Sequence, residues 1–171
     1  IHQALQHLVV GGNALIFMSR AGLKLFPLNR YVIERDGNGE VIEIVTKERI
    51  NHKLIEKHLP EDFHSSSYDS VVDNGYGDMG KNECDIYTHV TRDNNRFVWH
   101  QEVYDYIIPE SRGKSPVNTT PWLPLRFNTV DGEAYGRGRV GQFIGDLKSL
   151  EALSQALVEG SAAAAKVVFV V

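Results

Sequence analysis

The spacing of apolar residues changes several times along the chain, and each change marks an expected element. Apolar residues recur at helical spacing over 1–10 and stop at Gly11-Gly12-Asn13, which predicts a short helix. Three runs rich in β-branched and aromatic residues then predict antiparallel strands over 14–18, 23–35 and 41–46. The turn at 36–39, Asp-Gly-Asn-Gly, is a strong hairpin signal. Helical spacing returns over 47–59 and ends before Pro60.

The middle of the chain combines a polar stretch with a second expected hairpin. Residues 61–82 are poor in apolar residues and rich in Ser, Asp, Gly and Asn, so we expect a long loop there. Strands are expected over 83–91 and 97–103, and 104–108 is compatible with an extension of the second one. The Pro-, Ser- and Gly-rich stretch 109–121 is expected to be a connection. Pro121 and Pro124 flank the next strand, 123–127, and favour a sheet edge or a bulge.

The longest helical pattern follows the Gly- and Arg-rich bend 135–141 and runs to about residue 165. At a rise of about 1.5 Å per residue, such a helix is roughly 35–40 Å long. Its side chains form a broad apolar side, a stripe of small residues and a narrow polar strip. The apolar side holds Val140, Phe143, Ile144, Leu147, Leu150, Leu153, Leu157 and Val158. The small stripe holds Gly145, Ser149, Ala152, Ala156, Gly160 and Ala163, and the polar strip holds Lys148, Gln155, Glu159 and Lys166.

This helix has two sides that can pack and little surface suited to water. A helix that packs once against its own globular core needs one apolar face and a wide polar one. Stripes of small residues let neighbouring backbones approach closely, a device best documented in membrane helices. Residues 137–166 carry too many charges for a membrane span. The pattern therefore predicts close protein neighbours on two sides, including copies of the same chain. The central helix of an ordinary monomer is the alternative.

The bend before the helix contains Gly136-x-Gly138-x-x-Gly141, the letter pattern of a dinucleotide-binding turn. That motif requires a strand directly before it and an acidic residue about 20 positions on, within a βαβ unit. Residues 131–135 have the composition of a turn instead, and Glu159 lies within the predicted helix. We therefore expect the glycines to redirect the chain between the β region and the helix. An enzyme that binds a nucleotide at this bend is the second alternative.

The composition is that of an ordinary globular protein: 42% of the 171 residues are hydrophobic, 23% are charged, and the formal charge is −4. The single cysteine, Cys84, excludes an internal disulfide framework. The net charge gives no sign of general nucleic-acid affinity. From Pro121 to the end five basic residues balance five acidic ones, whereas 61–85 holds seven acids and one lysine. The first residue lies within a helical pattern and 167–171 is a bare apolar run, so we expect a segment of a longer chain.

Candidate catalytic and metal-binding groups are scattered. The seven histidines show no HxH or HExxH spacing, and Cys84 lacks a second thiol. His89 and His100 are expected to face each other across the second hairpin, where a metal would bind only adventitiously. The aspartates of 61–82 lack the spacing of a calcium loop. No GxSxG elbow, P-loop or kinase loop is present. We therefore expect a protein that is not an enzyme and uses no cofactor or metal.

Three stretches carry a family resemblance. They are LQHLVVGGNALIFM…LKLFPLNRYVIERDGNGEVIEIVTKERI, ECDIYTHV at 83–90, and PWLPLRFNTVDGEAYGRGRVGQFIGDLKSLEALSQALVEGSAAAAKVV from residue 121. Together they resemble the head-to-tail connector (portal) proteins of short-tailed bacteriophages. The third stretch is the most specific, because the family has a proline-flanked strand, a DGE-x-YGR turn and a GDL-[KR]-SLE helix. The resemblance covers nearly the whole chain and is weakest at 60–82 and 104–120.

The resemblance implies an α+β fold in three parts. An antiparallel, hairpin-rich wing domain with short helices would occupy 1–138, one long stem α-helix 139–166, and the first clip strand 167–171. The function implied is that of a non-enzymatic subunit in a ring of twelve at one capsid vertex of the virion, assembled in the host cytoplasm. Double-stranded DNA would pass through the ring non-specifically. Terminase, scaffolding, capsid and tail adaptor proteins would be the partners, with no membrane involved.

In such a ring each stem helix has a neighbour on both sides, in agreement with the two packable sides of 139–166. We expect helix packing through Gly145, Ser149, Ala152, Ala156, Leu150, Leu153 and Leu157. Polar contacts with DNA or with a neighbouring subunit are expected from Arg137, Arg139, Lys148, Gln155, Glu159 and Lys166. The polar strip would face either the channel or the outer solvent. The rival interpretation is a monomeric α+β protein-interaction module of unrelated origin, built around the long helix.

Overall fold

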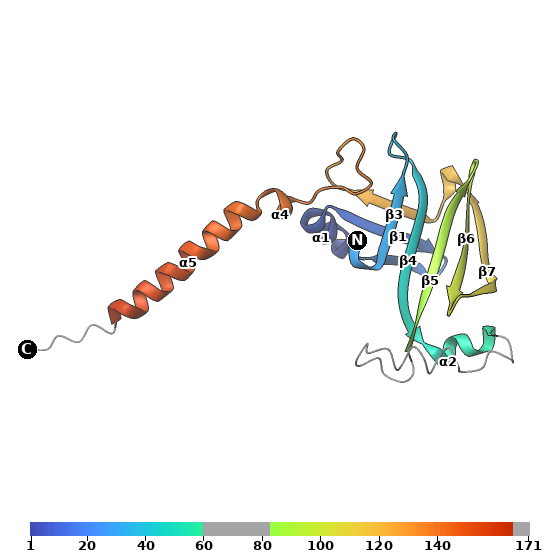
Figure 1. Ribbon diagram of the computed structural model, residues 1–171, viewed down its shortest axis with the longest axis horizontal. Helices are drawn as coiled ribbons and strands as arrows, with labels where there is room; N and C mark the ends of the chain where they lie inside the picture. Colours follow the sequence, from blue (N-terminus) through green and yellow to red (C-terminus); the bar gives the residue numbers. More distant parts are fainter. Residues whose placement is uncertain (60–82, 166–171) are drawn as a thin grey trace, which may run out of the picture.

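A computed structural model of the protein describes residues 1–59 and 83–165, and in it a β-rich body carries one projecting helix (Figure 1). All strand pairs are antiparallel, so the expected combination of α-helices and antiparallel β-sheet is confirmed. The first sheet has the order β2-β1-β8 and contains β1 (Asn13–Ser19), β2 (Gly22–Phe26) and β8 (Trp122–Arg126). The second has the order β3-β4-β5-β6-β7 and contains β3 (Tyr31–Arg35), β4 (Val41–Asn51), β5 (Glu83–Asp93), β6 (Arg96–Val103) and β7 (Tyr106–Pro116).

The two sheets pack face to face around the main core. Alternate residues of each strand point to one face, and these side chains interleave between the sheets. The core consists of Leu15, Phe26, Tyr31, Ile33, Ile44, Val90, Phe97 and Trp122. Phe17 and Trp122 form its aromatic centre, with ring centroids 4.3 Å apart. Strand β8 lies at an edge of its sheet, where its proline needs no ladder partner, as the flanking prolines predict.

A second, smaller core lies at the far end of the five-stranded sheet. There the short helix α2 (His52–Ile55) and the 3-10 turn η2 (Glu56–His58) cover β5 and β6. Ile55 packs on Cys84, Ile86, Val103 and Ile108. The predicted helix over 47–59 is therefore wrong in its first five residues. Strand β4 runs on through Asn51 because its antiparallel ladder with β5 continues to the Asn51–Glu83 pair, and Lys47 and Arg49 form ion pairs with Asp85 on that strand.

The single strand expected over 23–35 is two strands in two different sheets. Pro27 ends β2 and begins the 3-10 turn η1 (Leu28–Arg30), which carries the chain across to β3. Proline fixes its own φ and lacks the N–H that a continuous ladder needs. The turn at 36–39 does join β3 to β4, with the Asp36 carboxylate accepting hydrogen bonds from the N–H groups of Asn38 and Glu40.

The connection expected over 109–121 is wrong over most of its length, because residues up to Pro116 belong to β7 and only η3 (Val117–Thr119) links it to β8. As an edge strand, β7 tolerates two prolines. Gly113 lies directly under Trp99, whose ring atoms would be 2.2 Å from any Cβ at that position. A bulge near Gln101 is held by Ser111, whose hydroxyl accepts the Gln101 N–H and donates to the Ile108 carbonyl.

The predicted N-terminal helix is confirmed as α1 (His2–Gly11). The long C-terminal helix is confirmed in type but begins later than 139. A single turn, α4 (Arg139–Gln142), is followed by a break at Phe143 and then by α5 (Ile144–Ala165), 22 residues or about 33 Å long. The expected loop 61–82, Lys166 and the expected strand 167–171 lie outside the described residues.

Candidate subunit interface on the projecting helix

The root of the helix is anchored by buried hydrogen bonds between the Asn13 amide at the start of β1 and the backbone of Gly136. Asn13 donates a 2.7 Å hydrogen bond from Nδ2 to the carbonyl oxygen of Gly136 and accepts one of 2.7 Å from the Gly136 N–H at Oδ1. Its side chain is only 3% exposed. One further backbone bond, from the Arg137 N–H to the Asn128 carbonyl, holds the same segment. The chain thus enters the helix from a fixed point on the body.

Glycine is required where this segment crosses the end of α1. A Cβ on Gly138 would lie 2.1 Å from the Val10 carbonyl oxygen, and one on Gly12 would lie 2.4 Å from the backbone of Arg137 and Gly138. Gly12 also has φ = +79°, which favours glycine. Gly141 has no such neighbour. The expectation that the glycines redirect the chain into the helix is confirmed for Gly138, and residues 131–135 form turns and bends rather than a strand.

The turn before the root is fastened to both sheets by polar side chains that the sequence analysis did not single out. Arg35 donates to three carbonyl oxygens, those of Ala134 (3.1 Å), Gly39 (2.9 Å) and Pro124 (3.2 Å). Burial, and then the nearby Arg126, lower the pKa of Arg35. The Tyr135 hydroxyl accepts the N–H of Ile33 at 3.0 Å. Except for Gly39, these partners lie about 90–100 positions apart, so no local sequence pattern reveals them.

The two arginines at the root already have partners within the chain. Arg137 forms a bidentate ion pair with Glu133, 2.5 Å from Nη2 to Oε1, which lowers the pKa of Glu133 and raises that of Arg137. The guanidinium of Arg139 lies 5.8 Å from the ring centroid of Phe127. Both side chains therefore stabilise the turn in the single chain.

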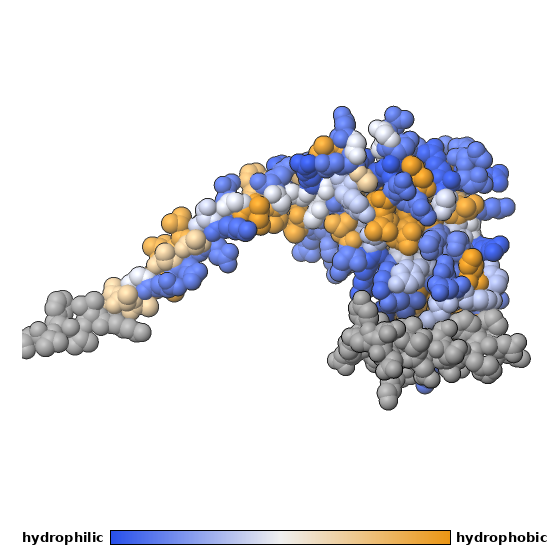
Figure 2. Space-filling view, in the orientation of Figure 1, coloured by the Kyte–Doolittle hydropathy of each residue, from blue (hydrophilic) through white to orange (hydrophobic). Residues whose placement is uncertain are grey.

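The apolar side of α5 is uncovered. Every residue of α5 is exposed, including Leu150 (61%), Leu153 (64%) and Leu157 (72%). Figure 2 shows apolar residues along the projecting helix with no other element over them. Two acids were missed in the sequence analysis: at 100° per residue Asp146 falls between Leu153 and Leu157, and Glu151 lies at the other border of the apolar side, beside Ile144. The exposed apolar area is of the kind that marks a protein interface.

The stripe of small residues is also uncovered, and the hydroxyl group of Ser149 on it forms a hydrogen bond within the helix. Ser149 donates to the carbonyl of Gly145 at 3.0 Å, so a neighbour packed there meets no unpaired donor from it. A Cβ on Gly145 or Gly160 would meet nothing within 4 Å. On the polar strip Gln155 donates to Glu159 at 2.8 Å, while Lys148 is exposed. The structure thus places the predicted packing residues and Lys148, Gln155 and Glu159 on α5, whereas Arg137 and Arg139 lie before it, at the root.

Neither a cluster of metal-ligating side chains nor a membrane-spanning helix is found in the residues that the structure describes. His89 and His100 do face each other across β5 and β6, with rings stacked at 5.3 Å. Within residues 1–59 and 83–165, no three metal-ligating side chains come together. No helix in these residues is both long and apolar enough to cross a bilayer.

A sequence model described as "Bacteriophage head to tail connecting protein" matches residues 1–171. The chain belongs to this family. The family match overturns the interpretation as a module of unrelated origin.

Individual portal proteins of podophages resemble the chain over nearly all its length. It is 36% identical to the portal protein of Enterobacteria phage T3 and 33% identical to that of Escherichia phage T7, in each case over 98% of this chain and 31% of the relative. It is 30% identical to the portal protein of Pseudomonas phage phiKMV over 91% of the chain and 30% of the relative. The chain therefore spans about a third of the length of these connector proteins.

Proposed function

We propose that this chain is the wing and stem portion of a portal subunit. Residues 1–138 form the wing part, 139–166 the stem helix, and 167–171 enter the clip. Twelve identical subunits form a ring at one capsid vertex, and double-stranded DNA passes along its axis during packaging and ejection. Terminase docks on the ring during packaging, scaffolding and capsid proteins surround it in the host cytoplasm, and tail adaptor proteins bind it in the virion.

The observation that carries this proposal is the helix α5, which is exposed on all sides in the single chain. Leu150, Leu153 and Leu157 leave about 60–70% of their surface in water, and a soluble helix with such a face normally buries it. In a ring of stems, the apolar side of one helix packs on the small stripe of the next. The stripe admits close backbone approach because Gly145, Ala152 and Ala156 project little from the helix.

A channel that lets DNA slide must bind phosphate weakly, because each neutralised phosphate adds affinity. Described residues of the root and helix support this: Arg137 is paired with Glu133, Lys148 is followed three positions later by Glu151, and Glu159 shares its polar strip. The polar strip faces either the channel or the outer solvent. Arg137, Arg139 and Lys148 are the bases available for transient contact with DNA or with acids of a neighbouring subunit.

The first test is the mass of the full-length protein containing this chain, by light scattering followed by negative-stain imaging. Rings of about a dozen subunits with a central hole are expected. A protein that stays monomeric at micromolar concentration, with and without scaffolding protein, would refute the proposal. Leu153→Asp is expected to abolish rings while leaving the body folded, and Gln155→Asp on the polar strip is the matched control.

The role of the three bases needs a separate experiment. Replacing Arg137, Arg139 and Lys148 together by Ala should reduce DNA packaging while rings still form. Glu133→Ala is a useful control, because it frees Arg137 from its ion pair without removing a base. Wild-type packaging and ejection by the triple variant would show that these bases do not contact DNA productively.

A further inference from the structure

One row of residues on the outer face of the five-stranded sheet, turned away from the main core, changes charge from one edge to the other. Strand pairing places five residues in one row from β3 to β7, and they are Glu34, Glu43, Thr91, Val98 and Lys114. The neighbouring row contains Val32, Val45, His89 and His100. The first row therefore begins with two carboxylates and ends with an ammonium group.

The acidic patch, Val32, Glu34, Glu43 and Val45, lines a shallow hollow of about 230 Å³. Glu34 and Glu43 are direct cross-strand partners. Like charges in that position destabilise a hairpin. Within the described residues no hydrogen bond or ion pair engages either carboxylate, and Val32 beside them is 58% exposed. The single chain thus presents two unpaired acids and two valines.

The basic patch, Val98, His100, Ile107, Arg112 and Lys114, lines a larger hollow of about 580 Å³ over Trp99. Arg112 and Lys114 are exposed and alternate with Gly113, so both side chains leave the same face of β7. In the part of the chain that the structure describes, neither base forms an ion pair. Val98 and Ile107 supply the apolar floor.

The two patches cannot neutralise each other within one chain. Four strand spacings of about 4.8 Å separate β3 from β7, or about 19 Å. Exposed charges that far apart are screened at physiological salt, where the Debye length is about 8 Å. Figure 1 shows β3 and β7 at opposite edges of the sheet.

We propose that the acidic patch of one copy binds the basic patch of a second copy of this chain. Two carboxylates meet two cations, and the valines meet the apolar floor beside Trp99. Because Arg112 and Lys114 form no ion pair within the residues that the structure describes, the surface that binds the basic patch is expected to be acidic. The apolar floor of Val98 and Ile107 suits a protein surface better than the phosphates of a nucleic acid. This contact rests on the proposed self-assembly and adds to it an interface in the body, separate from α5.

The test uses charge reversal in the full-length protein that contains this chain. Glu34→Lys with Glu43→Lys, and separately Arg112→Glu with Lys114→Glu, should each weaken self-association at least about tenfold, because both place like charges in contact. A variant carrying all four changes restores opposite charges and should recover assembly. Arg20→Glu with Lys53→Glu is the matched control, since both residues are exposed and lie outside the patches. Circular dichroism checks that each variant is folded.

The outcomes separate this contact from the proposed function. Rings or oligomers that form equally well in all variants would overturn the contact and leave the portal proposal standing. Loss of assembly in both pairs without recovery in the four-residue variant would also overturn it. A wild-type protein that never self-associates would refute the proposed function, and the contact with it.

Discussion

Replacing Gly138 by Ala tests whether the Gly-rich bend is a structural joint. The new Cβ would lie 2.1 Å from the carbonyl oxygen of Val10, where an ordinary carbon–oxygen contact is about 3.3 Å. The obstacle is backbone on both sides, so the segment must move away from α1 by about 1.2 Å. That displacement stretches the two 2.7 Å bonds between Asn13 and Gly136 beyond the hydrogen-bonding range.

The expected loss in the free energy of unfolding follows from these two hydrogen bonds. A buried hydrogen bond contributes about 0.5–1.5 kcal/mol, and a buried group left unsatisfied costs about 1–3 kcal/mol. A total of about 3 kcal/mol corresponds to a fall in Tm of about 6–12 °C for a domain of this size. Gly141→Ala is the matched control, because its Cβ meets nothing within 4 Å and Ala favours the helix by up to about 1 kcal/mol. Equal melting temperatures for the two variants would refute the reasoning.

Three further predictions concern the body. Burial, and then Tyr135, raise the pKa of Tyr31 from 10 to about 12, with Arg35 opposing. The free energy of unfolding should therefore keep its full value below pH 10 and fall by about 2–3 kcal/mol as the pH rises through 12. In denaturant titrations at several pH values, Tyr31→Phe should remove this fall. Cys84 is buried and its pKa is raised by desolvation, so thiol reagents should label it only as fast as the protein opens; immediate labelling of the native protein would contradict this. Arg35→Met should cost about 3 kcal/mol in urea unfolding, because three backbone carbonyls lose a charged donor, and Arg35→Lys should recover only part of it.

The sequence predicted local features well wherever one pattern decided the outcome. The 3.6-residue period of 144–165 and the turn at 36–39 are set by residues close in the chain. Residues 47–51 form a strand because they pair with β5. Their partners, such as Tyr87 and Asp85, lie about forty positions away, so no local pattern could predict the pairing. The β7 strand was missed because its prolines and Gly113 are typical of loops, and only pairing with β6 makes them acceptable.

The candidate interface also has a part that the sequence predicts and a part that it does not. The apolar and small sides of α5 follow from the sequence alone, since helix geometry fixes them. The anchor at its root does not, because Asn13 and Gly136 are 123 positions apart. The opposed charges on the outer sheet face also depend on strand register, and the sequence by itself shows Glu34 and Lys114 only as scattered surface charges.

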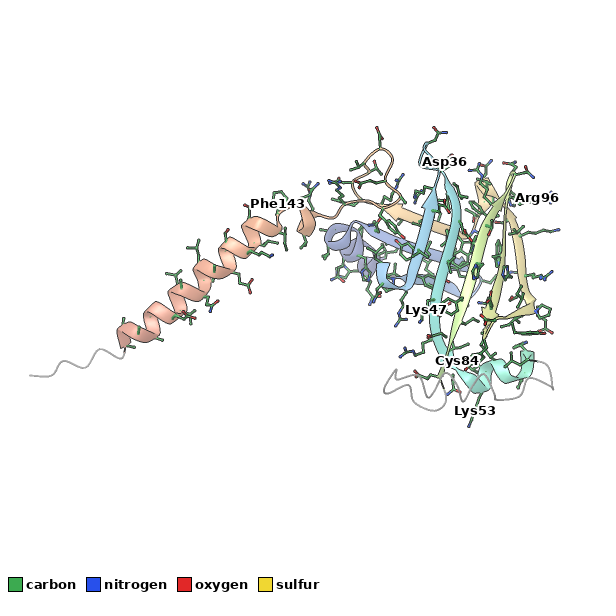
Figure 3. All side chains as sticks on the ribbon, in the orientation of Figure 1. Asp36, Lys47, Lys53, Cys84, Arg96 and Phe143 are labelled. Carbon is green, nitrogen blue, oxygen red and sulfur yellow. The ribbon has the colours of Figure 1, made fainter. Side chains whose placement is uncertain are left out.

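The break at Phe143 makes the projecting helix a lever. Figure 3 places Phe143 between the anchored root and the free rod, and its φ of −109° departs from helical geometry. A rotation of about 10° at this point would carry the tip of a 33 Å rod through about 6 Å, close to one helical turn. The root would stay still, because Gly138 is packed backbone to backbone on α1. A force that turned α5 about Phe143 by this angle would therefore move whatever the tip touches by about 6 Å while the root kept its place on α1.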